Sequence, residues 1–527
     1  MCRPFCERRD RDAPSLVIFG AERVDLEKRL TAWASWADYR REEHAVAKLP
    51  SGGEFKGALF FPSDYSVGMA NLGYHYIYRS LKELGIAIER FFLSPIPYRS
   101  VEGDTLFERF SLFLGSIAYE GDVPLFARWL AKGGVNPSRT RRDFEGAPIV
   151  GAGGAITYIN PLSLSGIADF IVLGDGLPVI PFFVDLLRKG LSRKRLLMGL
   201  AEHPSILVPA IHVDEKNASF TMKLSKQSDL SKEYGHATWV TSKTVFGKTL
   251  LVELQRGCCR GCRYCTLPSC FGPFRQRPVA LVEKEIREIA SAVDFDQVGL
   301  ITPEAGDYRG LERLLATIDG LEKGVSFASL RVDGLTKEIV SYLVRKGRRS
   351  ITVAPESGDD TLRFSCGKNF TNERIVEVLS MAKEANVKFA KLYFMIGLPG
   401  ERDEHIESIF RLCREIVSAT NMKLVASVSP FVPKPFTAWR NKPFAGVGEL
   451  KRKYALLSRA FRGFSKAELQ SVSVREAHME FALSWATSGV SRQLADCVAS
   501  GGSTKEIITN IDRAKTVTEL ASLGLAC

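Results

Sequence analysis

Short apolar runs alternate with helical patterns along residues 57–190. Each run is brief and bounded by glycine or polar residues, which is typical of a buried strand. The predicted strands are residues 58–61, 112–117, 149–151 and 170–173, and the predicted helices are residues 72–85, 124–132 and 178–189. This alternation predicts a parallel sheet covered by helices on both faces, a Rossmann-like α/β domain whose ligands bind beyond the carboxyl ends of the strands. Glycines that permit close backbone approach gather at those ends: Gly68, Gly73, Gly151, Gly153, Gly154, Gly174 and Gly176.

Residues 248–440 repeat a strand-then-helix unit six times. The predicted strands are 249–255, 297–302, 326–332, 350–355, 388–397 and 423–430; the predicted helices are 279–292, 309–320, 336–346, 371–386 and 403–418. Six such units predict a (β/α)6 partial barrel, whose functional face lies where the strands end.

The remaining segments are less regular. We expect a strand at 15–19, a helix over 24–39, a hairpin from 206–213 and 218–222, helices at 447–461 and 473–485, and a helix capped by Ser503 and Glu506. The predicted boundaries are an N-terminal extension (1–56), the Rossmann-like domain (57–190), a connector (191–245), the barrel (246–440) and a helical C-terminal region (441–527).

The stretch between residues 250 and 277 carries the candidate chemistry, LLVELQRGCCRGCRYCTLPSCFGPFRQR. Cys258, Cys262 and Cys265 stand at C-x3-C-x2-C spacing directly after the first predicted barrel strand. Three close thiolates suit an iron–sulfur cluster. They would leave one iron of a four-iron cluster open, which favours chemistry over electron storage.

Other interpretations of these cysteines stay open on spacing alone. Cys259, Cys262 and Cys265 form a ferredoxin-like C-x2-C-x2-C run, but the next cysteine, Cys270, comes one residue late and Phe271 follows it instead of proline. A zinc site needs two cysteine pairs or a cysteine and histidine set, and no histidine lies nearby. Unpaired core cysteines are the remaining alternative.

The chain resembles the radical S-adenosylmethionine (SAM) superfamily, within it the subgroup that carries an N-terminal cobalamin-binding-type domain. Tyr264 is the aromatic residue that such motifs place before the last cysteine. Further similar stretches span most of residues 57–440: VGMANLG, ELQRGCCRGCRYC, RQRP, LITPEAGDYRGL, SLRVDGL, APESGDDTLR, KLYFMIGLPGE and VSPFVPKPFTAW. The resemblance implies a [4Fe-4S] cluster on Cys258, Cys262 and Cys265 that cleaves SAM reductively.

The resemblance also suggests which strand ends bind SAM. Arg331 is the candidate for the SAM carboxylate, because a guanidinium pairs with a carboxylate in a fork. Glu356 is the candidate for the amino group or the ribose. Tyr264 and the backbone of Ile396 and Gly397 are candidates for the surface under the adenine. The alternative for Arg331 and Glu356 is a structural ion pair at the barrel rim.

Cobalamin binding stays open. The D-x-H-x-x-G motif that supplies a cobalt ligand is absent, and His75 in GYHYIY lacks its flanking Asp and Gly. Cobalamin without a protein ligand to cobalt is one interpretation. A sheet that merely closes over the barrel mouth is the other.

Composition and charge narrow the class of protein. The 527 residues are 45% hydrophobic and 25% charged, as in soluble globular proteins. We expect no membrane span and no secretory signal, because no apolar run reaches about 18 residues and the N-terminus is charged. Eleven cysteines, an odd and scattered number, do not indicate a disulfide framework, so we expect a reducing cytoplasmic location.

The net charge of +12 suggests an anionic partner such as RNA. The basic residues are dispersed in small groups that we expect at solvated loops or helix ends: Arg139/Arg141/Arg142, Arg193/Lys194/Arg195, Arg345/Lys346/Arg348/Arg349 and Lys451/Arg452/Lys453. The expected function is a radical SAM enzyme that modifies a small molecule or natural product by methylation, group transfer or rearrangement. Its electron donor would be a flavodoxin or ferredoxin. An RNA-modifying radical SAM enzyme and a non-catalytic iron–sulfur protein are the alternatives.

Overall fold

The computed structural model describes residues 35–527 except for 216–220, 328–329, 338, 341, 343–349, 505–510 and 526–527. Several predictions concern residues outside this set. They are the strand at 15–19, most of the helix at 24–39, most of the strand at 218–222, most of the helix at 336–346, the cap residue Glu506 and the basic group at 345–349.

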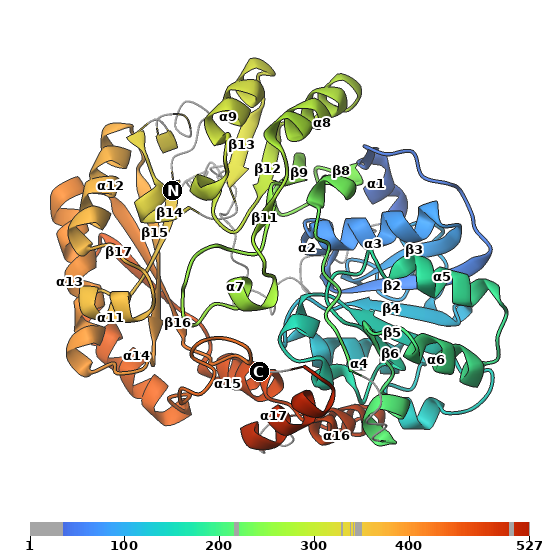
Figure 1. The fold of residues 1–527 in the computed structure, drawn as a ribbon. Coiled ribbons are helices and arrows are strands. Elements are labelled where there is room, and N and C mark those ends of the chain that lie inside the picture. Colours follow the sequence, from blue (N-terminus) through green and yellow to red (C-terminus); the bar gives the residue numbers. More distant parts are fainter. Residues whose placement is uncertain are drawn as a thin grey trace, which may run out of the picture.

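The N-terminal domain is a six-stranded sheet with the order β3-β2-β4-β5-β6-β7 (Figure 1). All neighbouring strands are parallel except β7, which pairs antiparallel with β6. The bounds are β2 Phe55–Asp64, β3 Ile86–Ser94, β4 Leu112–Ser116, β5 Ile149–Gly153, β6 Phe170–Val172 and β7 Ile206–Leu207. The strand order reverses direction between β2 and β4, and such a switch point is where doubly wound sheets bind ligands. The predicted α/β class is confirmed.

Helices cover both faces of this sheet because successive strand residues point to opposite sides. Phe60 of β2 packs in one hydrophobic cluster with α4 (Asp122–Lys132) and the C-terminal α16 (Ser488–Ala499). Its neighbours Leu59 and Phe61 pack in the other cluster, against α3 (Leu72–Glu83), α5 (Ile180–Arg188) and α6 (Arg193–Ala201). The short helices α1 (Trp36–Arg41) and α2 (Tyr65–Gly68) complete that second face.

The sequence patterns did not predict β3, for a physical reason. Its sequence IAIERFFLS contains Glu89 and Arg90, so it is not a continuous apolar run. Arg90 is nevertheless buried, because it pairs with Glu43 at 2.7 Å and Glu102 at 2.5 Å and stacks over Trp239. A buried ion pair therefore replaces an apolar residue in the middle of this strand.

The second domain is a partial barrel of parallel strands, drawn from green to orange in Figure 1. One sheet has the order β13-β12-β9 and the other β14-β15-β16-β17. The strands are β9 Thr249–Glu253, β12 Gln297–Ile301, β13 Gly324–Phe327, β14 Ser350–Glu356, β15 Phe389–Ile396, β16 Lys423–Pro430 and β17 Ala467–Ser471. The helices are α8 Val279–Ala292, α9 Leu311–Gly320, α11 Asp360–Ser365, α12 Asn372–Glu384, α13 Asp403–Thr420 and α14 Val447–Phe461.

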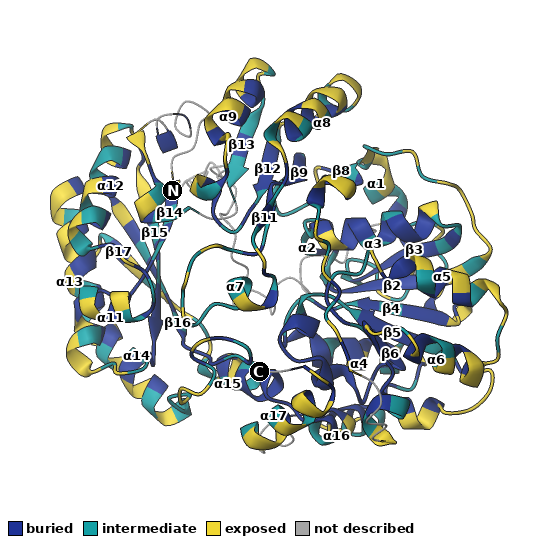
Figure 2. Cartoon of the chain, in the orientation of Figure 1, coloured by how far each residue is buried: buried dark blue, intermediate teal, exposed yellow. Residues whose placement is uncertain are grey.

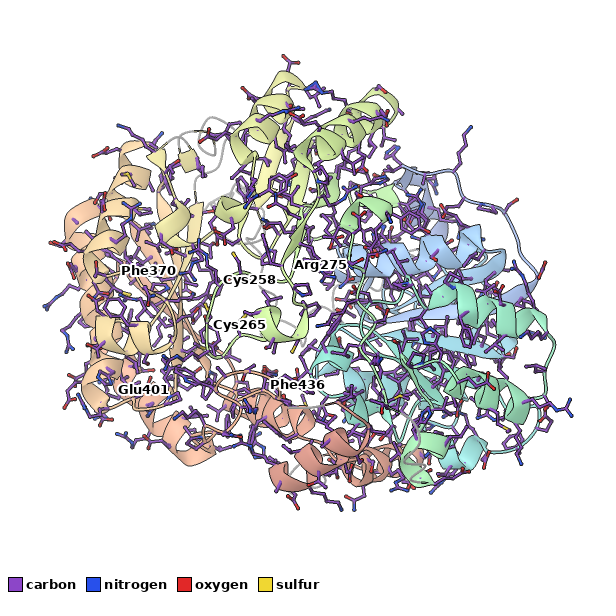
Figure 3. The ribbon with its side chains drawn as sticks, in the orientation of Figure 1. Cys258, Cys265, Arg275, Phe370, Glu401 and Phe436 are labelled. Atoms are coloured by element: carbon purple, nitrogen blue, oxygen red, sulfur yellow. The ribbon has the colours of Figure 1, made fainter. Side chains whose placement is uncertain are left out.

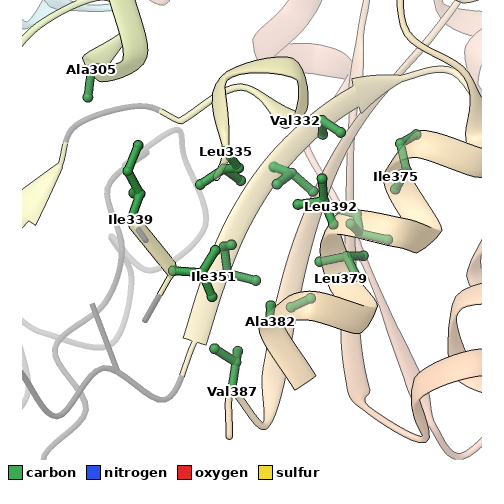
Figure 4. Packing of buried hydrophobic residues seen from close by; sticks show 14 of the residues in the cluster. Ala305, Val332, Leu335, Ile339, Ile351, Ile375, Leu379, Ala382, Val387 and Leu392 are labelled. Carbon is green, nitrogen blue, oxygen red and sulfur yellow. The ribbon is translucent and has the colours of Figure 1, made fainter. Parts of the chain in front are cut away.

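One hydrophobic core joins the barrel strands to their helices. Figure 4 shows Ile351 of β14 and Leu392 of β15 facing Leu379 of α12. The helical spacing of residues 371–386 and 403–418 predicted this arrangement, since an apolar stripe must lie against the sheet.

The predicted hairpin is wrong. The segment 206–213 is not a hairpin arm: β7 adds to the N-terminal sheet, and residues Ala210–Asp214 form a helical turn. The C-terminal region is mainly helical, as predicted, and it also contributes the strand β17, which pairs with β16 in parallel. Helices α15 (Val474–Ser484), α16 and α17 (Arg513–Ser522) then run back under the N-terminal domain, where Asn160 Nδ2 donates to Ala486 O at 2.8 Å (Figure 1).

The expectation that every basic group is solvated is also wrong. Arg139, Arg142 and Arg193 are buried, and Figure 2 shows how little of the N-terminal domain's interior is exposed. Arg193 lies 2.8 Å from Asp169, and the same carboxylate lies 3.4 Å from Arg142. Arg142 and Arg193 thus neutralise one buried carboxylate, and the three arginines contribute little to a positive surface because they are themselves buried. In the part of the chain that the structure describes, no helix is long and apolar enough to cross a membrane.

Candidate functional site

The motif cysteines lie in residues 257–274, which we call the cysteine loop. The two short strands that flank this loop pair with each other, and we call this pair the neck of the loop. Strand β10 (Gln255–Arg256) enters the loop and β11 (Arg275–Gln276) leaves it; these strands pair antiparallel, with Arg256 opposite Arg275. Figure 3 places Cys258 and Cys265 at the centre of the molecule, between the barrel and the N-terminal domain. The loop thus follows β9 at the carboxyl end of the barrel strands.

The three motif cysteines are half-buried free thiols that influence one another. The backbone N–H of Arg260 donates to Cys258 Sγ at 3.4 Å, and Arg331 Nη1 donates to Cys262 Sγ at 3.6 Å. Burial raises the pKa of the Cys258 thiol, and it raises the pKa of Cys265 to about 11 with a contribution from the other two thiols. Metal binding to these sulfurs would therefore have to displace protons.

The donor set fits an iron–sulfur cluster better than a single metal ion. Among the described residues, no three His, Cys, Asp or Glu side chains come together closely enough to hold one metal ion. Zinc needs four ligands at about 2.0–2.3 Å from one centre. In a cluster each thiolate binds a different iron, so the ligands stand further apart. Three thiols from one loop, one of them beside the Arg331 guanidinium, suit this arrangement.

The fold brings the predicted SAM residues to the cysteine loop. Tyr264 Oη donates to Glu356 Oε1 at 2.7 Å, and Arg331 reaches the Cys262 sulfur. Both charged residues also form ion pairs: Glu356 with Lys368 at 2.6 Å and Arg331 with Asp333 at 2.8 Å. The ion pairs that were the structural alternative are therefore present, and they lie beside the cysteines.

The strand-five candidates contribute differently. Ile396 is fully buried in the barrel core, so its side chain does not face the loop. Gly397 has a φ of 80°, and its N–H donates to Glu401 at 2.6 Å. The Gly397 N–H is thus engaged within the chain, and the role of this pair under an adenine stays a prediction.

Tyr264 also packs on an apolar cluster formed by ends of later barrel segments: Leu362, Cys366, Met395, Leu398, Phe431 and Trp439. Strand ends five and six thus supply apolar surface beside the cysteine loop. The Arg263 backbone fastens the loop there, since its N–H donates to Cys366 O and its carbonyl accepts from Trp439, both at 2.9 Å.

Lys368 and Glu304 were not assigned roles by sequence reasoning. Lys368 follows α11, away from any strand end, and only folding brings its Nζ to Glu356 and to Ala354 O. Glu304 follows β12 and is 2% exposed, with Oε2 lacking a hydrogen-bond partner. Burial raises the pKa of Glu304 to about 7. Its carboxyl group therefore changes charge near neutral pH.

A cavity of about 590 Å³ lies between the N-terminal sheet and the cysteine loop. Six of the seven glycines singled out in the sequence line it, at the ends of β5 and β6 and near α3. Gly68 does not; a side chain there would collide with the Phe92 ring. Leu59 of β2 and Leu114 of β4 flank the switch point of the sheet. The site is thus where a doubly wound sheet binds ligands.

Polar side chains form one corner of this cavity. Arg256 lies 3.1 Å from Asp175, 2.5 Å from Glu233 and 2.8 Å from Glu253. Gln255 is 3% exposed; its Oε1 accepts from Thr302, whereas its Nε2 has no partner. The orphan amide is a donor that a ligand in the cavity can use.

His75 does not take part in this cavity. It is fully buried in α3, where Nδ1 accepts from the Thr238 N–H at 3.1 Å and Nε2 lies 3.0 Å from Met69 O. Both ring nitrogens are occupied by the protein.

Family models match two parts of the chain. The radical SAM superfamily model matches residues 252–413, and the model for the N-terminal region of radical SAM proteins matches residues 73–209. Together they cover more than half of the chain. The chain belongs to the radical SAM superfamily, whose members use a [4Fe-4S] cluster and SAM.

Curated relatives match over shorter stretches. An uncharacterized protein of Methanocaldococcus jannaschii, MJ0966, is 33% identical over 209 residues, which are 40% of this chain and 46% of that protein. The ribosomal protein uS12 methylthiotransferase RimO of a Thermoanaerobacter species is 24% identical over 35% of this chain and 46% of that protein. The chain thus spans less than half the length of these relatives.

The fold is similar to a solved structure over most of its length. The radical SAM methyltransferase TsrM from Kitasatospora setae, with cobalamin and a [4Fe-4S] cluster bound, has a TM-score of 0.52 and 13% identity. The match covers 85% of this chain and 98% of that chain. A Rossmann-like domain followed by a radical SAM barrel is therefore the architecture of this protein.

Proposed function

We propose that the protein is an enzyme that holds a [4Fe-4S] cluster on Cys258, Cys262 and Cys265, cleaves SAM reductively and modifies a small molecule or natural product. One observation supports this proposal most. The cysteine motif meets two strand-end residues, Cys262 through Arg331 and Tyr264 through Glu356, in a chain that belongs to the radical SAM superfamily. When bound, the cluster supplies the electron that breaks a sulfur–carbon bond of SAM.

The residues of this chain would bind and orient SAM. Arg331 would exchange part of its contact with Asp333 for the SAM carboxylate, because a guanidinium can donate to both carboxylate oxygens in a fork. Glu356, held by Lys368, would accept hydrogen bonds from the amino group or the ribose. Tyr264 and the Gly397 backbone would lie under the adenine. Positioning of this kind lowers the entropic barrier of the reaction.

We infer that the cavity takes cobalamin without a protein ligand to cobalt. Its position at the sheet switch point, its glycine-lined rim and its orphan Gln255 amide support a large ligand with hydrogen-bond acceptors. His75, with both ring nitrogens engaged, would not reach the metal. A cavity that closes over the barrel without a cofactor is the competing interpretation.

The small-molecule substrate is favoured over RNA by the position of the basic residues. Arg142 and Arg193 pair with the buried Asp169, and the buried Arg139 pairs with Asp214, so these three guanidinium groups are not available for phosphates. RNA modification is the second candidate, because a tRNA-2-methylthio-N(6)-dimethylallyladenosine synthase is 24% identical over 36% of the chain.

The test is anaerobic purification with added hydroxocobalamin, followed by ultraviolet–visible spectra with and without SAM. Cluster absorbance, a SAM-induced change and SAM cleavage under dithionite are expected, with electrons in the cell coming from a flavodoxin or ferredoxin. A cluster that never responds to SAM would support the non-catalytic iron–sulfur alternative. RNA that co-purifies and dissociates steeply with salt would support the second candidate.

A further inference from the structure

Two arginines face each other at the neck of the cysteine loop. Arg256 of β10 and Arg275 of β11 are direct partners in the antiparallel pair that closes the loop. Side chains at such positions are about 4.5–5.5 Å apart at Cβ, and like charges there are destabilising. Both arginines are largely buried, so water does little to screen them. The neck therefore needs a counter-charge.

Asp175 of the N-terminal domain supplies that charge. Its Oδ2 lies 3.1 Å from Arg256 Nη1 and 3.8 Å from Arg275 Nη1. Glu233 and Glu253 also pair with Arg256, but Asp175 is the carboxylate, within the described part of the chain, that pairs with both arginines. It reaches them from the turn after β6, where Gly174 takes a φ of 85°.

The Asp175 side chain is itself held in place. Tyr158 Oη donates to Oδ1 at 2.6 Å, and the Gln227 N–H donates to Oδ2 at 2.8 Å. The Tyr158 ring stacks on Phe271, a residue of the cysteine loop, with 4.3 Å between the ring centroids. The N-terminal domain thus contacts the start of the cysteine loop through Arg256. It contacts the end of the loop through Phe271 and Arg275. Figure 3 shows Arg275 on the side of the loop that faces this domain.

We propose that Asp175 is a positioning residue that clamps the neck of the cysteine loop and thereby fixes where Cys258 and Cys265 are presented. The proposal rests on the proposed function only in the role that it gives those cysteines; the clamp itself is a property of the cluster-free protein. Asp175 also lines the cavity. A molecule that enters the cavity therefore lies against the residue that holds the loop.

Hydrogen–deuterium exchange of the cluster-free protein tests the clamp. The amide of Arg263, which bonds to Cys366 O, and that of Arg277, which bonds to Leu254 O, report loop opening. Asp175→Asn should speed exchange across residues 256–277 by about tenfold or more, the effect of losing one charge-assisted hydrogen bond. Tyr158→Phe, which keeps the stacked ring, should give a smaller increase in the same peptides.

The control is Asp185→Asn, which removes an exposed carboxylate from α5 of the same domain. It should leave exchange in residues 256–277 unchanged. Unchanged exchange in Asp175→Asn, or an increase spread evenly over the N-terminal domain, would overturn the clamp. If Asp175→Asn fails to fold, Tyr158→Phe alone decides, because it removes one hydroxyl group and no charge.

A second measurement uses the reconstituted protein. With the clamp loosened, the electron paramagnetic resonance signal of the reduced cluster should broaden or shift in Asp175→Asn and not in Asp185→Asn. Absence of any cluster in the wild-type protein would refute the proposed function and leave the exchange result standing. A wild-type-like signal in Asp175→Asn would refute the positioning role while leaving the proposed function intact.

Discussion

Tyr264 donates a hydrogen bond to Glu356 over 2.7 Å, and this contact joins the cysteine loop to the end of β14. Tyr264 stands between Cys262 and Cys265, whereas Glu356 adopts a φ of 64° and is held by Lys368. A non-glycine residue rarely adopts this left-handed conformation unless its surroundings enforce it. Loop and strand end thus form one unit around the candidate SAM site.

Replacing Tyr264 with Phe should weaken SAM binding. The ring and its packing remain, and one buried hydrogen bond worth about 1 kcal/mol is lost, so affinity should fall about fivefold. Anaerobic titration of the reconstituted protein with SAM measures this. The control is Tyr234→Phe, because the Tyr234 hydroxyl bonds to Glu83 on the exposed side of α3. If both variants bind SAM with the same affinity, the Tyr264 hydroxyl plays no part in SAM binding.

Replacing Arg331 with Gln should have a larger effect. A charge-assisted fork to a carboxylate is worth about 1.5–3 kcal/mol, so SAM affinity should fall by roughly tenfold to a hundredfold. Arg331→Lys should recover only part of it, because lysine lacks the fork. If Arg331→Gln binds SAM as wild type does, the ion pair with Asp333 is the residue's only role. Arg313→Gln, on the outer surface of α9, is the matched control.

The cysteine pattern predicts which thiols hold iron. Alanine at Cys258, Cys262 or Cys265 should abolish the cluster absorbance and the bound iron, since each thiolate binds its own iron. Alanine at Cys259 should leave both intact, although it lies only 3.5 Å from Asp307 at the same face. If the Cys258→Ala variant keeps its iron and the Cys259→Ala variant loses it, the alternative C-x2-C-x2-C set of ligands is favoured.

A buried ion network should matter for stability. Lys434, in the segment after β16, lies 2.6 Å from both Glu120 of the N-terminal domain and Glu480 of α15. Burial opposes its charge, but the two carboxylates outweigh burial and raise the pKa of Lys434. Lys434→Met leaves Glu120 buried without its cation and should cost about 3–5 kcal/mol in urea unfolding. Arg452→Met removes an exposed ion pair and should leave the unfolding midpoint unchanged.

His75 should make stability depend on pH. Burial lowers the pKa of His75 from 6.5 to about 4, so the unfolded chain binds the proton more readily. Its contribution is therefore present above pH 6.5 and is lost as the pH falls from 6.5 towards 4, by at most about 1.4 kcal/mol per pH unit. Thermal unfolding between pH 7.5 and 5 should show this slope, and His75→Gln should flatten it. An equal slope in both proteins would assign the acid sensitivity to other groups.

Much of the fold followed from periodicity, and the exceptions have physical causes. Helices α8 and α14 and strand β16 begin and end where the patterns predicted, because an apolar face must be buried wherever the helix lies. Strand β3 was missed because Arg90 satisfies its charge through Glu43 and Glu102, which are distant in sequence. Strand β17 was missed because only its pairing with β16 makes it a strand.

The candidate site divides in the same way. Spacing together with the family resemblance singled out Cys258, Cys262 and Cys265, because the whole motif lies within eight neighbouring residues. The partners of that loop were decided by folding: Lys368 beside Glu356, and Asp175 between Arg256 and Arg275. A motif made of neighbouring residues can be recognised from the sequence. Contacts between residues far apart in the sequence depend on the path of the whole chain. The contact of Asp175 in one domain with two arginines of the other forms only when both domains have folded and packed together.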